Sequence, residues 1–476
     1  MEALRRDAGD VRCNNGLGLV RLRRGSYALA EDHFRQAIAT LTLRNPNPRG
    51  GEPYYNLGLA VKYQGRLDEA YDALYKAIWS YAWQSPSYYA VAQIDCQRGH
   101  WDAALDHLER SLRTNSRHLK ARDLRAAVLR HLGRYSEAEA LVEGTIALDP
   151  LDIWALGERA LACRAQGKAD EADRHLDQPA GMMDGDGGLR RVHYHFDLAF
   201  DYAGAGLYSE ASEVLERLVA EDHERAVVYP MVLYALGYLA KLQGKDDMRP
   251  ALYERAARMP PDFCFPVRLE EQDILEDVLA ANPDDARAHY YLGNLLYDKR
   301  RYHEAIARWE DACRLAPEFG IPWRNLGIAY FNARRDGARA RECYLKAFAL
   351  APGDGRILSE LDQLLKRLGE APAERLARLE AHPELVAERD DLSVERATLY
   401  NQLGQSAKAL EIVTSRRFHP WEGGTGRVSA QYVAAHVALG KSALTVGRGD
   451  EASDVSAPVA TYPENLGEVF RDGFHN

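Results

Sequence analysis

The sequence predicts an all-α fold, a right-handed superhelix or solenoid of about twelve helix–turn–helix repeats. Three observations predict it. Glycines recur at a constant interval, small and aromatic residues keep fixed places around them, and proline follows several of the second helices. A chance period would not stay in register over several units, so we infer a true repeat of about 34 residues.

The glycines mark the turns between the two helices of each pair. Glycine is favoured at this place because a helix often ends there in a left-handed backbone conformation. Three successive steps, from Gly65 to Gly167, measure 34 residues each. Arginine takes the same place twice, and the predicted turns are Gly25, Gly65, Gly99, Gly133, Gly167, Gly206, Gly244, Arg300, Arg334, Gly369, Gly404 and Gly447.

Residues 286–317 show the pattern of one unit most clearly. Gly293 lies in the middle of the first predicted helix, and Pro317 ends the second. Small residues are expected where two helices approach closely, and large ones fill the space between neighbouring repeats. The marks along this unit are Leu292, Gly293, Tyr302, Ala305, Trp309, Ala312 and Pro317. Their spacing resembles the tetratricopeptide repeat, which implies a superhelical scaffold that binds other proteins.

The repeats before residue 260 follow the pattern with two local departures. In repeat 5, Pro179 cuts the second helix short, and the Gly/Asp-rich residues 180–188 predict a loop. In repeat 7, Pro250 is tolerated only in the first turn of a helix. The second helix of that repeat is therefore expected to begin at about Met248.

An excess of sequence interrupts the alternation of helices after repeat 7. The interval from Gly244 to Arg300 is 56 residues, which exceeds the period of 34 by 22. Residues 266–283 have the length and apolar spacing of one extra helix. We therefore predict an N-terminal block of about seven repeats at 1–260, a boundary with the extra helix at 261–285, and a C-terminal block at 286–476 whose last repeats are degenerate.

Composition excludes several classes of protein. The chain has 476 residues, 46% hydrophobic and 28% charged, which is typical of a folded protein. Its net charge of −10 disfavours nucleic acid as a partner. No run of about 18 apolar residues predicts a membrane span, and no apolar segment follows the N-terminal basic residues, so neither a membrane partner nor a secretory signal is expected. None of the six cysteines forms a CxxC pair, which favours free thiols and a cytoplasmic location.

A concave groove is the first candidate binding site. The first helix of each repeat lines the inner surface of such a superhelix, and aromatic and arginine residues, which carry much binding energy, predominate there. An alternative is that several of these tyrosines pack inside the superhelix. Asn294 and Arg324, with Asn325, resemble part of the clamp that some tetratricopeptide domains use on a peptide carboxylate. The predicted groove residues are Tyr55, Tyr89, Arg130, Trp154, Phe196, Tyr234, Tyr238, Tyr290, Asn294, Tyr297 and Arg324.

The loops between repeats are the second candidate. Four of them, at 45–53, 180–188, 418–426 and 461–468, are long or rich in Pro, Gly, Trp and acidic residues. Insertions in repeat proteins gather in loops and often form the binding face. A pair of carboxylates would suit work on a glycosidic bond, whereas the alternative is that these glutamates cap helices. The candidate loop residues are Glu52, His419, Trp421, Glu422, Glu464 and Asn465.

No catalytic, metal or cofactor site is predicted. His193 and His195 are two residues apart and would point to different sides of a helix, so they are poor co-ligands. His419 and Glu422 are the one close pair of histidine and acid in an unusual loop. Phosphate-binding glycine loops, the GxSxG motif and HExxH are absent from the sequence.

Longer phrases carry a narrower resemblance. These phrases are NPNPRGGEPYYNLGL, AQIDCQRG, YYLGNLLYDKRRYHEAI, SRRFHPWEGGTGRV and YPENLGE. They are similar to the C-terminal tetratricopeptide region of large bacterial proteins with an uncharacterised N-terminal domain, and the resemblance implies a sugar-related setting.

From the repeat pattern and the groove residues, we predict a non-catalytic scaffold that binds a peptide segment or partner domain in the groove. The alternative is a carbohydrate-binding or carbohydrate-processing accessory module that uses the loops.

Overall fold

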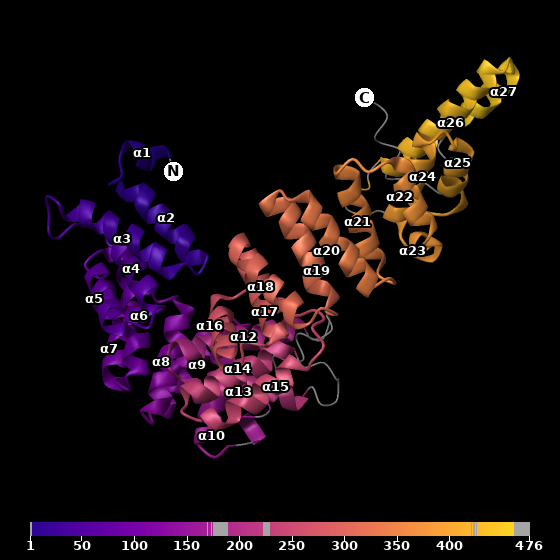
Figure 1. The fold of residues 1–476 in the computed structure, drawn as a ribbon. Helices are drawn as coiled ribbons and strands as arrows, with labels where there is room; N and C mark the ends of the chain where they lie inside the picture. The colour runs from indigo at the N-terminus through magenta and orange to yellow at the C-terminus, as the bar shows by residue number, and fades with distance from the viewer. Residues whose placement is uncertain are drawn as a thin grey trace. The chain divides into compact units, whose positions relative to one another are not determined.

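The computed structural model describes residues 2–168, 170–172, 174, 189–221, 229–419, 421, 424 and 426–460. Over these residues the chain is built of α-helices joined by short turns, without a β-strand. Two compact units divide it, Met1–Ala305 and Ile306–Asn476, and the division falls within one helix. Figure 1 shows the paired helices of each unit, coloured along the chain. The predicted all-α solenoid is confirmed.

The first unit consists mainly of helix pairs, with one additional helix, Leu269–Ala281, before the last pair. Its helices are α1 (Glu2–Arg6), α2 (Val11–Arg23), α3 (Tyr27–Thr42), α4 (Glu52–Lys62), α5 (Leu67–Ala77), α6 (Tyr81–Gln97), α7 (Trp101–Thr114), α8 (Leu119–His131), α9 (Tyr135–Ile146), α10 (Ile153–Ala165), α12 (Leu189–Gly204), α13 (Tyr208–Glu221), α14 (Pro230–Leu242), α15 (Arg249–Ala257), α16 (Leu269–Ala281) and α17 (Ala286–Asp298). A 3₁₀ turn, Asp246–Met248, precedes α15, and α18 (Tyr302–Leu315) contains the division between the units.

The second unit continues the alternation with shorter and less regular helices. They are α19 (Gly320–Ala329), a π-helical turn at Tyr330–Arg334, α20 (Gly337–Leu350), α21 (Gly355–Arg367), α22 (Pro372–Glu380), α23 (Pro383–Glu388), α24 (Asp390–Gln402), α25 (Ser406–Ser415), α26 (Arg427–Thr445) and α27 (Gly449–Ser456), followed by a 3₁₀ turn at Ala457–Ala460. The one-and-a-half-turn helix α23 was not predicted from the sequence.

The predicted turns adopt the left-handed backbone conformation, with one correction. Each predicted turn glycine has a positive φ, from Gly25 at 71° to Gly447 at 78°, and Arg300 has a φ of 59°. The correction concerns Arg334. The left-handed residue is Arg335, with a φ of 60°, because the π-helical turn at Tyr330–Arg334 inserts one residue before it.

The two departures expected around repeat 7 are present. Helix α15 begins at Arg249, so that Pro250 lies in its first turn. Helix α16 lies inside the stretch 266–283, where one extra helix was expected. The division at 1–260, 261–285 and 286–476 stays a prediction from the repeat pattern. The loop at 180–188 lies outside the described residues.

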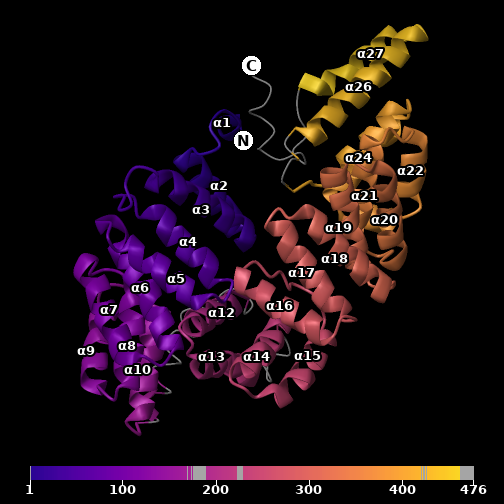
Figure 2. The same cartoon turned by 60° about the vertical axis from the view of Figure 1, so that its left-hand side comes forward.

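Contacts between residues distant in sequence join early and late helices of the first unit. The Gln97 side-chain amide donates to the Gly204 carbonyl at 2.8 Å, which joins the ends of α6 and α12. Gly25, in the turn between α2 and α3, lies against Leu269 and Gln272 of α16. Figure 2 shows α12 and α16 beside the helices of the first three repeats. Helices α12 and α16 therefore lie against the earlier repeats and narrow the space inside this unit.

Helix caps explain several of the boundaries. Asp10, Asp152, Asp285, Asp336 and Asp354 each stand before a helix and accept a hydrogen bond from a backbone N–H of its first turn. Aspartate is favoured there because those N–H groups have no partner within the helix. Within the described ranges, no helix combines the length and apolar character needed to cross a membrane.

Candidate functional site

Of the predicted groove residues, Arg324 alone lies in the second unit, where it bonds to Glu360 beside a cavity on the inner face. Helices α19, α21 and α24 are the first helices of three successive repeats. A cavity of about 210 Å³ lies between α19 and α21, with Tyr344 of α20 beneath it. It is lined by Gly327, Ile328, Phe331, Asn332, Tyr344, Ser359, Glu360, Gln363, Leu364 and Arg367. This cavity, called the α19–α21 cavity below, is large enough for a side chain of a partner.

A π-helical turn forms one wall of the α19–α21 cavity. Phe331 and Asn332 belong to this turn, and the backbone N–H of Arg335 bonds to the carbonyl of Tyr330. Such wide turns are rare and occur frequently at functional sites. The Arg367 guanidinium lies 5.8 Å from the centre of the Phe331 ring, on the opposite wall. The cavity mouth thus combines an aromatic ring, an amide and a cation.

Close packing beneath the cavity depends on a glycine. A Cβ at Gly327 would lie 2.4 Å from the Tyr344 ring, so no larger residue fits without movement of that ring. The Tyr344 hydroxyl donates to Glu360 Oε2 at 3.3 Å. Gly327 therefore lets α20 hold its tyrosine against α19 while the hydroxyl reaches α21.

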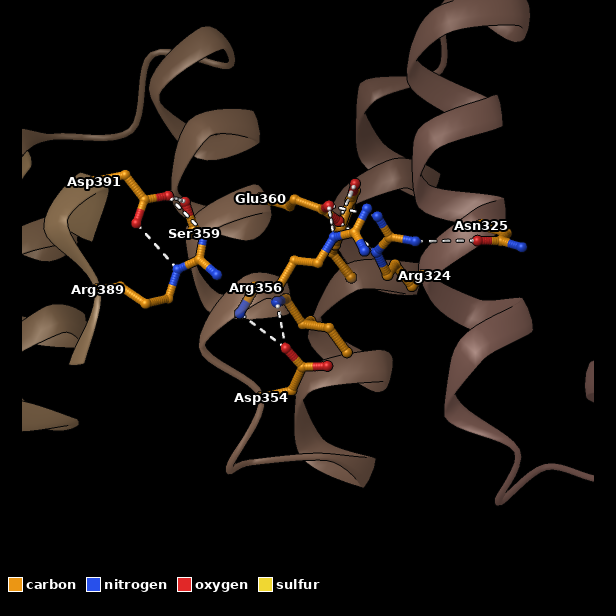
Figure 3. Close-up of polar contacts among 10 residues, drawn as sticks. Arg324, Asn325, Asp354, Arg356, Ser359, Glu360, Arg389 and Asp391 are labelled. Carbon is orange, nitrogen blue, oxygen red and sulfur yellow. Dashed lines mark hydrogen bonds and ion pairs between the residues drawn. The ribbon is translucent and has the colours of Figure 1, made fainter. Parts of the chain in front are cut away.

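Arg324 and Arg356 converge on Glu360, as Figure 3 shows. Arg324 Nε donates to Glu360 Oε2 at 2.6 Å, and Arg356 Nε donates to Oε1 at 3.2 Å. Burial works to lower the pKa of Arg324, but the hydrogen bond and charge of Glu360 outweigh it and raise that pKa. Glu360 thus pairs with two guanidinium groups, the Asp354 carboxylate also acts on Arg324, and the Arg356 side chain is 66% exposed. The Arg356 guanidinium is therefore the part of this cluster that solvent reaches most readily.

A second polar cluster lies where α21 faces α24. Ser359 Oγ donates to Asp391 Oδ2 at 2.8 Å, and Arg389 Nε donates to Asp391 Oδ1 at 3.0 Å (Figure 3). Burial would raise the pKa of Asp391, but the hydrogen bonds from Arg389 and Ser359 lower it. Arg356 and Arg389 also line a shallow recess of about 720 Å³ beside the cavity. The two clusters thus continue one polar surface across three repeats.

A buried ion network holds these helices in place. Glu395 of α24 is 1% exposed and accepts hydrogen bonds at 2.7 Å from Lys366, Arg375 and Arg427. Arg375 of α22 also donates to Asp362 of α21 at 3.0 Å. Burial would raise the pKa of Glu395, but its bonds to Lys366 and Arg375 lower it. Charged groups from four helices are therefore fixed relative to one another.

Four predicted groove residues lie in the core instead. Trp154, Phe196, Tyr234 and Tyr290 are at most 3% exposed. Their rings fill the space between helices of the first unit, and the Tyr234 hydroxyl donates to Asp285 at 2.8 Å. The structure corrects their placement, because a partner cannot reach these rings without displacing a helix.

The other predicted groove residues of the first unit are partly buried, and several of them already have partners. Arg130 donates to Glu158 at 2.8 Å and 3.2 Å. Tyr89 accepts a hydrogen bond from Gln93, which in turn accepts one from Lys62. Tyr55, Tyr238, Asn294 and Tyr297 are partly buried as well. Gln93 and Glu158 come from the same or the adjacent repeat as their partners Tyr89 and Arg130, so packing between neighbouring helices makes these residues less accessible than the repeat pattern predicts.

The loop candidates do not converge in the described part of the chain. Glu52 is the first residue of α4, and its place in the first turn fits a capping role. The His419 side chain is 81% exposed, near Asp390. Trp421 is partly buried and packs against the core of the second unit. Glu422, Glu464 and Asn465 lie outside the described residues.

Sequence reasoning missed the polar partners on α21 and α24. Arg324 was named, whereas Ser359, Glu360, Arg389 and Asp391 were not. A signal was available for Ser359. Arg324 lies ten residues before the predicted turn at Arg334, and Ser359 lies ten residues before the predicted turn at Gly369. In the described ranges, no group of three or more His, Cys, Asp or Glu residues is placed to hold a metal ion.

Comparison with known proteins supports the repeat assignment. The tetratricopeptide repeat family model matches residues 2–48, 91–153, 272–318 and 292–355, and a second model of the same repeat matches 153–178. Tetratricopeptide repeat protein 37 of Xenopus laevis is 30% identical over 147 residues, which are 29% of this chain and 9% of that protein. The chain therefore spans less than a tenth of the length of this relative.

Two solved structures resemble the fold. One is a tetratricopeptide repeat protein from Parabacteroides merdae, 17% identical, with a TM-score of 0.36; the match covers 56% of this chain and 98% of that one. The other is a structure of Naa15/Naa10 bound to HypK-THB, 13% identical, with a TM-score of 0.27, where the match covers 94% of this chain and 78% of the other.

Proposed function

We propose that this chain, which carries tetratricopeptide repeats, is a non-catalytic scaffold that binds an extended segment of a partner protein on the inner face of α19, α21 and α24. Helical-repeat proteins of this type generally mediate protein–protein interactions through such faces. The observation that carries the proposal is the α19–α21 cavity, which the π-helical turn and Tyr344 shape. Phe331 and Arg367 line its mouth.

The charges around the cavity indicate how a segment would be held. The cavity would take one side chain, while Arg356 and Arg389 would contact the backbone carbonyls or acidic groups of the flanking residues. Arginine suits this task because its five donors lie in a fixed plane. The ion network around Glu395 joins α21 to α24, which reduces the entropy lost when a segment binds there.

The test begins with peptides selected from a displayed random library against the intact chain. Affinities are then measured by fluorescence anisotropy for the wild type, for Gln363→Trp, which fills the cavity, and for Lys346→Trp. Lys346 is an exposed residue of α20 that lines neither recess, so it serves as the matched control. We expect at least a tenfold loss of affinity for Gln363→Trp and no change for Lys346→Trp. Selected peptides that bind both variants like the wild type would contradict the proposal.

The described residues give no support to the carbohydrate alternative. Stacking on a sugar ring needs an exposed aromatic face, whereas Trp421 packs against core residues, and a Cβ at Gly424 would lie 2.4 Å from its ring. Glu422 and Glu464, two of the three candidate loop glutamates, lie outside the described residues.

A further inference from the structure

A recess larger than the α19–α21 cavity lies in the first unit, away from the surface discussed above. It has a volume of about 480 Å³ and lies between α3 and α5, the second helices of repeats 1 and 2, with α4 as its floor. Its apolar lining comes from Ile38, Ala39, Leu57, Val61 and Ala73. The volume falls in the range of about 300–1,000 Å³ that is typical of ligand sites. We call it the α3–α5 recess.

Polar contacts close the two ends of the α3–α5 recess. Arg35 Nη2 donates to Glu69 Oε2 at 2.8 Å and so joins α3 to α5. Lys76 Nζ donates to Asn47 Oδ1 at 2.6 Å and so joins α5 to the connection before α4. These contacts limit the recess to about two helical turns, because its α5 lining runs from Glu69 to Lys76.

Comparison with the next repeat explains why the recess is open. Ala73 lies eight residues after the turn glycine Gly65, and His107 takes the same place after Gly99. His107 stacks on Tyr88 with ring centres 5.8 Å apart and meets Tyr75 edge-on at 6.3 Å, and so fills the next groove. The small side chain of Ala73 leaves the first groove unfilled.

One charge at the mouth of the recess is unmatched. Asp72 is exposed and, within the described part of the chain, makes no hydrogen bond or ion pair. Lys76, four residues on, would be its natural helical partner. Its ammonium turns instead to Asn47 and to the Trp79 ring, 3.9 Å from the ring centre. Trp79 is 65% exposed and extends the apolar surface beyond the recess.

We propose that the α3–α5 recess docks an amphipathic helix of a partner protein, which inserts apolar side chains and places a lysine or arginine against Asp72. The apolar lining follows helical spacing on α4, at Tyr54, Leu57 and Val61. An amphipathic helix presents its apolar side chains at the same spacing, which suits a groove of two turns. Arg35 and Lys76 already have partners. The Asp72 carboxylate is therefore the charged group that remains available to a docked helix.

The probes are three synthetic helical peptides of about five turns. The first carries leucines at positions i, i+4 and i+7 with one lysine beside them, the second has glutamate in place of that lysine, and the third has serine in place of the leucines. Fluorescence anisotropy gives their affinities for the intact chain. We expect the leucine–lysine peptide to bind at least tenfold more tightly than either of the others.

Two variants of the chain locate the site. Ala73→His, which copies the residue of the next groove, should weaken the leucine–lysine peptide at least tenfold, whereas Ala103→His on the exposed side of α7 should not. Asp72→Asn should abolish the preference for lysine over glutamate without altering the packing. Its control is Asp106→Asn, seven residues after Gly99 as Asp72 is after Gly65, where the carboxylate already pairs with Arg110 at 2.8 Å.

Several results would overturn the proposal. These are no binding of the leucine–lysine peptide at its solubility limit, equal affinity for wild type and Ala73→His, or an unchanged charge preference in Asp72→Asn. Circular dichroism confirms that each variant is folded. The Gln363→Trp variant should bind this peptide like the wild type, so this proposal and the inner-face proposal fail separately.

Discussion

Single small residues determine how closely the helices of a pair approach. In four repeats, a Cβ on the mid-helix glycine would come within 2.4 to 2.5 Å of a large residue of the second helix. The pairs are Gly18 with Phe34, Gly58 with Leu74, Gly237 with Tyr253, and Gly327 with Tyr344. The sequence pattern alone predicted small residues at these contacts, because the constraint is local and repeats with the period.

Gly327→Ala tests this constraint where it also shapes the candidate site. The added methyl group would clash with the Tyr344 ring, and we expect a loss of about 1–3 kcal/mol in the free energy of unfolding. The control is Gly353→Ala, since nothing lies within 4 Å of a Cβ there. Thermal melts of both variants give the answer, and equal melting temperatures would show that the ring has room to move.

A buried carboxyl group in the first unit should make stability depend on pH. Asp123 is 2% exposed, and burial, with Asp152, Glu158 and Asp201 nearby, raises its pKa to about 9. The folded chain therefore keeps a proton that the unfolded chain releases near pH 4. Between these two values the unfolded state binds fewer protons, so stability from this group falls as pH rises, by up to ~1.4 kcal/mol per pH unit.

Asp123→Asn should remove this loss of stability at higher pH. Relative to the wild type, the variant should gain melting temperature progressively from pH 5 to pH 8. The exposed Asp102→Asn is the control. A constant difference between Asp123→Asn and wild type over this range would show that Asp123 does not change its protonation as expected.

At the scale of elements, the π-helical turn distinguishes α19 from the first helices of the other repeats. It adds one residue before the left-handed position, so that Arg335 takes the place that Arg334 was predicted to take. The sequence did not reveal this turn, because its residues, Tyr330–Arg334, have no composition that separates a π turn from an α turn. The polar partners on α21 were not predicted, because the choice of groove residues favoured aromatic residues and arginine, whereas these partners are Ser359 and Glu360.

Deletion of Ala333 should return this turn to regular α-helical geometry. Phe331 and Asn332 would then rotate away from the α19–α21 cavity, and peptides selected on the wild type should lose at least tenfold in affinity. Arg335→Gly is the matched comparison: it relieves a positive φ, should stabilise by about 1 kcal/mol, and should leave peptide affinity unchanged. Full affinity in the deletion variant would show that the turn does not shape the site.

The ion network of the second unit gives a second prediction at this scale. Arg375→Met would leave Asp362 and Glu395 buried without their shared partner, and we expect a loss of about 3–5 kcal/mol. Arg341→Met removes the half-exposed arginine that pairs with Glu370, which keeps its bond to Arg378, and should cost less than about 1 kcal/mol. Chemical denaturation followed by circular dichroism separates the two. Similar losses would mean that Lys366 and Arg427 suffice to balance Glu395.

At the scale of the whole molecule, the period predicted the number and order of the repeats, but not how the first unit narrows. The contact between Gln97 and Gly204 joins residues 107 positions apart, and a small change of rotation at each repeat would remove it. Such a rotation depends on packing at every helix interface. The period identifies which face of a helix points inward, but not how much of that face stays open. Trp154 and Phe196 were therefore assigned to the right helices and to the wrong depth.

The central claim is that the inner face of α19, α21 and α24 holds a partner segment. Hydrogen–deuterium exchange on the intact chain, with and without a peptide selected on it, tests this claim most directly. We predict that added protection falls on residues 320–402, strongest in the turn at 330–334 and in α21, and that Gln363→Trp abolishes it. Protection confined to other helices, or none at saturating peptide, would contradict the account.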